Sequence, residues 1–102
     1  MNRPQEPTAF VHRNSKWLLV VGLNWGEEDS PQRIEENVAW QNAFYAAMLP
    51  FSTRGAYQNF TDPAEYDWAR AYYGSALTSL RKVKRAFDPT NVFQFPQSIR
   101  PA

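Results

Sequence analysis

The segment Lys16–Trp25 reads KWLLVVGLNW and decides which fold class the rest of the chain can adopt. It is rich in branched and aromatic residues, lacks a capping residue and is short for a helix, so it predicts a β-strand. Both of its faces are largely apolar, which is typical of a strand that is covered on both sides. Gly22 interrupts the strand and predicts a bulge or, less often, the close approach of another group.

Length and composition limit what surrounds this strand. The chain has 102 residues, of which 43% are hydrophobic and 16% aromatic, so it has room for one domain and is too apolar to be disordered. A formal charge of +1 gives no field that would attract nucleic acid or an anionic membrane. The absence of cysteine excludes disulfides, thiolate metal sites and thiol nucleophiles.

The first residues have no features of a targeting segment. Residues 1–9 are mostly polar and lack an apolar stretch, so they predict an N-terminal tail rather than a secretory signal. The longest apolar run, residues 17–23, is far shorter than the roughly 20 residues of a membrane-spanning helix. We therefore expect a soluble, cytoplasmic protein without a membrane partner.

Three helices are predicted from start and stop signals. Ser30 as N-cap and Pro31 at the first helical position start a helix that ends at Leu49-Pro50. Asp62-Pro63, with Glu65 in capping-box position, predicts a short second helix ending at Gly74. Ser75 then caps a third helix over residues 76–87, which Asp88-Pro89 ends.

These elements predict an α+β fold. One or two antiparallel strands are covered by about three helices, and residues 90–102 form an irregular C-terminal tail whose apolar side chains dock elsewhere. An isolated pair of strands is marginal in water. The sheet must therefore be completed by another chain, a second copy or a longer parent, which makes the chain an incomplete fragment of a domain.

The candidate site lies in RGAYQNFTDP, residues 54–63. In an extended segment Tyr57 and Asn59 project to one side, whereas Gln58 and Phe60 project to the other. A phenol and an amide on one face can hydrogen-bond the edge of a flat heteroaromatic ligand. The alternative to ligand binding is that Tyr57 and Asn59 are buried and hydrogen-bond the neighbouring backbone.

His12 is the only histidine, so we expect it to be structural or exposed and predict no metal site.

The order of motifs resembles one known family. FVHR at residues 10–13, KWLLVVGLNW, RGAYQNFTDP, WARAYYG and DPTNVFQFPQSI follow one another as in the C-terminal end of the berberine bridge enzyme family of FAD-dependent oxidoreductases. The resemblance runs from about Thr8 to Pro101 with spacing kept throughout. It implies that residues 10–102 are the end of the substrate domain plus the segment that returns to the FAD domain. It also implies Tyr57, Asn59 and Gln97 as cofactor-binding residues.

The resemblance further implies how such a chain functions. In the family, hydride passes from a substrate alcohol or amine carbon to flavin, and many relatives place a tyrosine base at the position of Phe60. Phenylalanine cannot take a proton, so we assign no catalytic residue, and the base comes from Tyr57 or from a missing part. Nothing in this sequence binds the ADP half of FAD. We expect FAD only with a complementary FAD-binding domain, and no catalysis by the isolated chain.

Two other functions fit the same residues. The chain could be a non-catalytic interaction module that forms a homodimer through its exposed strand and aromatic tail. It could also be a small ligand-binding protein that uses Tyr57 and Asn59, although the segment lacks a second wall to close a pocket. The sequence does not distinguish sugars, alkaloids and polyketide-type alcohols as substrates, nor a natural fragment from a split subunit or an expressed piece.

Overall fold

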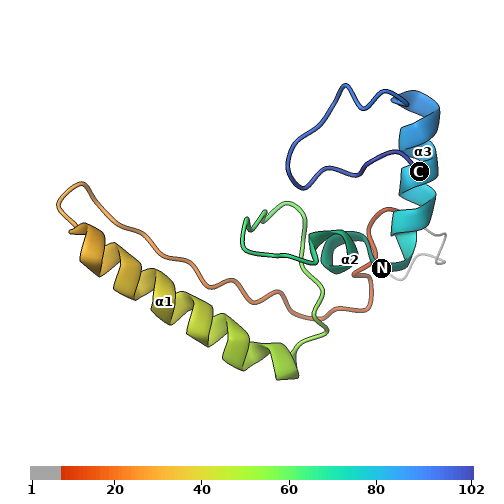
Figure 1. The fold of residues 1–102 in the computed structure, drawn as a ribbon. Helices are drawn as coiled ribbons and strands as arrows, with labels where there is room; N and C mark the ends of the chain where they lie inside the picture. The colour runs from red at the N-terminus through yellow and green to blue at the C-terminus, as the bar shows by residue number, and fades with distance from the viewer. Residues whose placement is uncertain (1–7) are drawn as a thin grey trace. The chain divides into compact units, whose positions relative to one another are not determined.

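The computed structural model describes residues 8–102, which belong to two compact units (Figure 1). The C-terminal unit joins residues 8–14 to Gly55–Ala102, and the α1 unit consists of Ser15–Arg54. The predicted N-terminal tail lies outside the described residues except for Thr8 and Ala9.

The α1 unit contains the first predicted helix. Helix α1 spans Pro31–Met48, and the side chain of Ser30 accepts a hydrogen bond from the Arg33 backbone N–H at 3.2 Å. Ser30 has extended backbone angles and Pro31 is the first helical residue, as the sequence predicts. After Met48 the chain continues as the 3₁₀ helix η1, Leu49–Phe51, instead of stopping at Leu49-Pro50.

The predicted α+β fold is wrong, because residues 8–102 contain no strand and no sheet. Residues 16–25 run alongside α1 in the same unit (Figure 1), and the Gln41 side-chain amide donates to the Val21 carbonyl at 2.6 Å. Apolar faces alone do not make a strand, which requires a ladder of backbone hydrogen bonds to a neighbour. Within the described chain, Trp17 is 91% exposed, so the segment is not covered on both sides. The space beside Gly22 is open and the segment is not a strand, so Gly22 marks neither a bulge nor the close approach of another group.

The C-terminal unit contains two helices joined without a break in helical turns. Helix α2 spans Trp68–Tyr73, the 3₁₀ helix η2 spans Gly74–Ala76, and α3 spans Leu77–Phe87. Gly74 has a φ of 45° and ends α2 as predicted. The predicted N-cap role of Ser75 is wrong, because α3 follows directly from η2 and its N-cap, Ala76, has no side-chain hydrogen bond.

The second predicted helix starts later than its capping signal. A side-chain oxygen of Asp62 accepts from the Ala64 N–H at 2.9 Å, and the Asp62 carbonyl accepts from the Glu65 N–H at 3.1 Å. These bonds form turns instead of a first helical turn. The helix begins only at Trp68, so the capping box at Asp62-Pro63 is wrong.

Little apolar surface is buried among the described residues. Only Ala71 and Tyr72 are buried hydrophobic residues, whereas Asp88, Gln97 and Ser98 are buried polar residues. The chain after α3 forms a long loop that returns to this helix (Figure 1), where the Ala102 N–H donates to the Arg81 carbonyl at 3.3 Å. In the described part of the chain, no helix has the length and apolar content needed to cross a membrane.

Candidate functional site

Tyr57 and Asn59 lie together in a tight turn. The Phe60 N–H donates to the Tyr57 carbonyl at 2.9 Å, so residues 57–60 form a turn and the predicted extended segment is wrong. The Asn59 side-chain amide donates to the Tyr57 hydroxyl oxygen at 2.9 Å. The two side chains are therefore adjacent, as predicted, but a turn brings them together instead of the alternation of a strand.

This pair presents complementary hydrogen-bonding atoms. A tyrosine hydroxyl that accepts a hydrogen bond still has its own proton to donate, and the amide of an exposed asparagine offers its Oδ1 as an acceptor. A donor and an acceptor side by side match the edge of a flat heterocycle that alternates carbonyl oxygens and N–H groups. The turn can thus recognise such an edge without any charged group.

A cavity of about 240 Å³ lies beside this turn. Asn59 and Gln97 both line it. Tyr57 does not line the cavity, but its hydroxyl is hydrogen-bonded to Asn59, which does. The remaining lining residues come from the turn, from α2 and from the C-terminal loop: Gln58, Thr61, Tyr72, Tyr73 and Phe95. The structure therefore brings together two of the three residues that the resemblance implies for cofactor binding.

A buried polar network forms the floor of this region. Gln97 is 7% exposed and Tyr72 is 2% exposed. The Tyr72 hydroxyl donates to the Gln97 Oε1 at 3.0 Å and accepts from the Asp62 N–H at 3.2 Å. The Gln97 Nε2 donates to the Asp62 carbonyl at 2.7 Å. Tyr72 was not predicted as a site residue, although it lies in the WARAYYG motif.

The other polar groups near the cavity have distinct environments. Burial, and then the neighbouring Tyr72, raise the pKa of Tyr73, so this phenol keeps its proton. The Oε1 of Gln58 is buried without a hydrogen-bond partner. Phe60 is 55% exposed and its ring centroid lies 5.9 Å from that of Tyr57, so this position supplies only hydrocarbon.

His12 takes no part in a metal site among the residues described. Its ring packs edge-on against Phe10 at 5.6 Å, and its Nε2 is buried without a hydrogen-bond partner. No group of three or more potential metal ligands occurs within residues 8–102.

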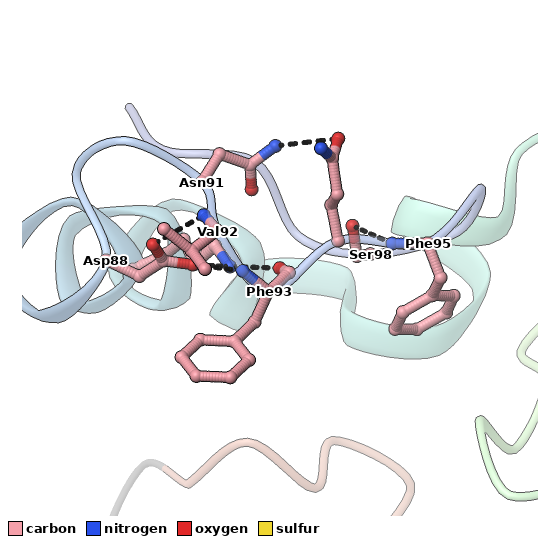
Figure 2. Close-up of polar contacts among 8 residues, drawn as sticks. Asp88, Asn91, Val92, Phe93, Phe95 and Ser98 are labelled. Carbon is pink, nitrogen blue, oxygen red and sulfur yellow. Dashed lines mark hydrogen bonds and ion pairs between the residues drawn. The ribbon is translucent and has the colours of Figure 1, made fainter.

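The loop after α3 is organised by Asp88 (Figure 2). Its two carboxylate oxygens accept from the Val92 N–H at 2.7 Å and from the Phe93 N–H at 3.0 Å. Its ion pair with Lys84, one helical turn earlier, adds a charged hydrogen bond. The Lys84 hydrogen bond is the largest of the effects that lower the pKa of Asp88, and the two backbone N–H groups contribute.

The same loop leaves aromatic side chains uncovered. Phe93 is 80% exposed, and the Phe95 N–H donates to the Ser98 hydroxyl at 3.1 Å (Figure 2). Asn91 adopts a φ of 56°, a left-handed conformation that asparagine tolerates better than most residues. The apolar tips are thus held on an ordered loop without a covering surface in the described chain.

Comparison with known proteins relates this geometry to a family. Residues 56–100 match the family described as "Berberine and berberine like", so the match covers the turn, α2, α3 and the loop. The chain is 38% identical over 96 residues to the uncharacterized FAD-linked oxidoreductase YgaK of Bacillus subtilis, covering 94% of this chain and 20% of YgaK. No solved structure matches at a significant level.

Two further relatives have named activities. A carbohydrate oxidase of Microdochium nivale is 38% identical over 101 residues, covering 92% of this chain and 20% of the oxidase. Reticuline oxidase of Papaver somniferum is 26% identical over 115 residues, covering 92% of this chain and 22% of that enzyme. The chain thus spans about a fifth of the length of these relatives. It belongs to the berberine bridge enzyme-like family of FAD-linked oxidoreductases, through that family's berberine-like domain.

Proposed function

We propose that this chain supplies one wall of the flavin site in an oxidoreductase that removes hydride from an alcohol or amine carbon. The FAD-binding domain lies on another chain or in a longer parent protein, and Tyr57 and Asn59 face the flavin. The observation that carries the proposal is the Asn59–Tyr57 hydrogen bond of 2.9 Å beside a cavity, because it fixes a donor and an acceptor next to each other.

The residues present fit part of an FAD site. The cavity, at about 240 Å³, is below the roughly 300–1,000 Å³ of typical small-molecule sites, so further walls are required. Tyr57 and Asn59 would hold the edge of the flavin ring through hydrogen bonds. When bound, FAD is the acceptor of the hydride. Phe60 has no group that takes a proton, and a Tyr57 phenol that donates its own proton to the flavin edge cannot accept another, so the proton of the substrate goes to a base outside this chain.

Exposed apolar side chains support a missing partner surface. Phe87 and Phe93 are each at least 80% exposed, and α1 buries none of its residues. Apolar surface of this kind on an ordered loop and helix is typical of an interaction site. We propose that the loop after α3 packs on the FAD-binding domain, which explains why the isolated chain would lack activity.

A hybrid protein tests this function. In the Microdochium nivale carbohydrate oxidase, the matched fifth of the enzyme is replaced by this chain, and bound flavin is measured by visible absorbance. We expect the hybrid to retain flavin and the oxidase lacking that fifth to lose it. We also expect the Tyr57→Phe/Asn59→Ala hybrid to fold but to show a changed flavin spectrum. Stoichiometric FAD and turnover in the isolated 102-residue chain would contradict the proposal.

The alternative function, a homo-oligomeric interaction module, was predicted to use an exposed strand and the aromatic tail as contact surfaces. The described residues contain no strand, so only the aromatic tail remains as a contact surface. Light scattering on the isolated chain separates the two. A tight homodimer whose contacts include Phe93, combined with a hybrid that binds no flavin, would favour the module.

A further inference from the structure

We infer that Gln97 positions the Tyr57–Asn59 turn and does not itself bind the cofactor. This inference rests on the proposed function and gives Gln97 a different role from the one that the family resemblance implies. The side-chain amide of Gln97 already has protein partners on both of its atoms. Oε1 accepts from Tyr72, and Nε2 donates to the carbonyls of Asp62 at 2.7 Å and of Glu65 at 3.5 Å.

Those partners fix one end of the turn. Asp62 lies just beyond Asn59 along the chain, and both of its backbone polar groups are used: its N–H donates to Tyr72 and its carbonyl accepts from Gln97. A backbone segment whose N–H and carbonyl both have partners cannot shift without breaking two hydrogen bonds. The Thr61 hydroxyl also donates to the Gln58 carbonyl at 3.1 Å, which keeps the intervening residues compact.

The other end of the turn is fixed to the same helix. The Ala56 N–H donates to the Ala71 carbonyl at 2.9 Å. Ala71 and Tyr72 are neighbours in α2 and are the two buried hydrophobic residues of the described chain. Residues 56–62 are thus held to α2 at both ends, at the second end through the Tyr72 hydroxyl, and Gln97 bonds both that hydroxyl and the Asp62 carbonyl.

Gln97 also connects the turn to the loop after α3. It follows the exposed Phe93 and Phe95 along this loop, and the adjacent Ser98 is buried as well. Of the loop residues, Gln97 has a side chain that reaches across to Asp62. A surface that covers the aromatic tips can therefore act on the turn through the hydrogen bonds of this amide, in addition to its effect on Phe95, which lines the cavity itself.

The test compares flavin properties in the hybrid oxidase. We measure the visible spectrum and the reduction midpoint potential of bound flavin in Asn59→Ala, in Gln97→Met and in the double variant. Gln97→Met should shift both quantities in the same direction as Asn59→Ala and by a smaller amount. The double variant should shift both quantities by less than the sum of the two single variants, because the part of the Gln97 effect that acts through Asn59 is already lost. Gln94→Met, a change in an exposed residue of the same loop, should leave both unchanged.

Each outcome decides a separate question. A shift with Asn59→Ala, but none with Gln97→Met, overturns the inference and leaves the proposed function intact. Fully additive shifts also overturn it, since Gln97 would then act on the flavin independently. No shift with Asn59→Ala overturns the proposed function itself. If Gln97→Met does not hold flavin, Gln97→Glu is measured in its place, because a carboxylate keeps the acceptor for Tyr72 but loses the donor to the Asp62 carbonyl.

Discussion

Removing one hydroxyl group by Tyr72→Phe should loosen the turn that carries the candidate site. The side chain is 2% exposed, and its hydroxyl bonds Gln97 and the Asp62 N–H at 3.0 and 3.2 Å. Phenylalanine keeps the ring, so no large cavity forms. Two polar groups lose their partner, and leaving a buried group unpaired costs roughly 1–3 kcal/mol. We therefore expect about 2 kcal/mol, since water can partly replace the bond to Asp62.

Hydrogen exchange in the hybrid oxidase measures this loss. A change of about 2 kcal/mol corresponds to a roughly 30-fold rise in the opening equilibrium, since about 1.4 kcal/mol is tenfold. Exchange at the amides of Ala56 and Phe60 should accelerate by that factor, while helix α1 stays unchanged. Tyr66→Phe is the matched control, because Tyr66 is 95% exposed. Acceleration below about threefold, or equal acceleration in α1, would refute the reasoning, since a threefold change is under about 0.7 kcal/mol.

Three further predictions address other parts of the chain. Ser30→Ala removes the N-cap of α1 and should cost about 1 kcal/mol, seen as faster exchange in the first turn of that helix, with Ser79→Ala as a control. Asp88 has a lowered pKa in the folded chain, so its stabilisation is present above the unfolded pKa and is lost as the pH falls through the folded one. The protection factors of the Val92 and Phe93 N–H groups, which are exchange rates corrected for the intrinsic effect of pH, should therefore fall in acid, and Asp88→Asn should abolish that fall. Protection factors that do not change with pH would contradict it. Phe60→Tyr restores a phenol at the family's base position and should speed flavin reduction in the hybrid, by at most the roughly 10²–10⁴-fold of a positioned base. An unchanged rate at every pH would show that the base lies elsewhere.

Local signals predicted the helices well where no distant contact competes with them. Ser30-Pro31 starts α1, and residues 76–87 agree with α3 to within one residue. Asp62-Pro63 is an equally good signal for a helix start, but no helix begins there. Its backbone is held in turns by Tyr72 and by Gln97, which is 35 residues away along the chain, so local propensity is overridden by tertiary hydrogen bonds.

The strand prediction failed for a different reason. KWLLVVGLNW has the composition of a covered strand, but a strand exists only when a neighbour supplies its ladder. Among the described residues, the Val21 carbonyl instead accepts from the Gln41 side chain. Composition reports what a segment can bury, not which backbone it pairs with.

The site was predictable in part. The spacing of Tyr57 and Asn59 indicated a shared face, and their side chains are hydrogen-bonded. Tyr72 and Tyr73 lie beside the same cavity from a helix that begins eight residues after Phe60. Only the three-dimensional arrangement of α2 brings them there. In the sequence, Tyr72 and Tyr73 are only two adjacent tyrosines before Gly74. Nothing in their spacing indicates that they line a pocket.

The distribution of tryptophan gives the chain an intrinsic optical probe. Trp17, Trp25 and Trp40 all lie in the α1 unit and are each more than half exposed, whereas Trp68 is partly buried beside Tyr72 in the other unit. Emission from the free chain is consequently dominated by indoles in water. Replacing Trp68 by phenylalanine would confine the tryptophans to residues 15–54. A blue shift of the tryptophan emission on mixing with a candidate partner would then report coverage of that unit alone.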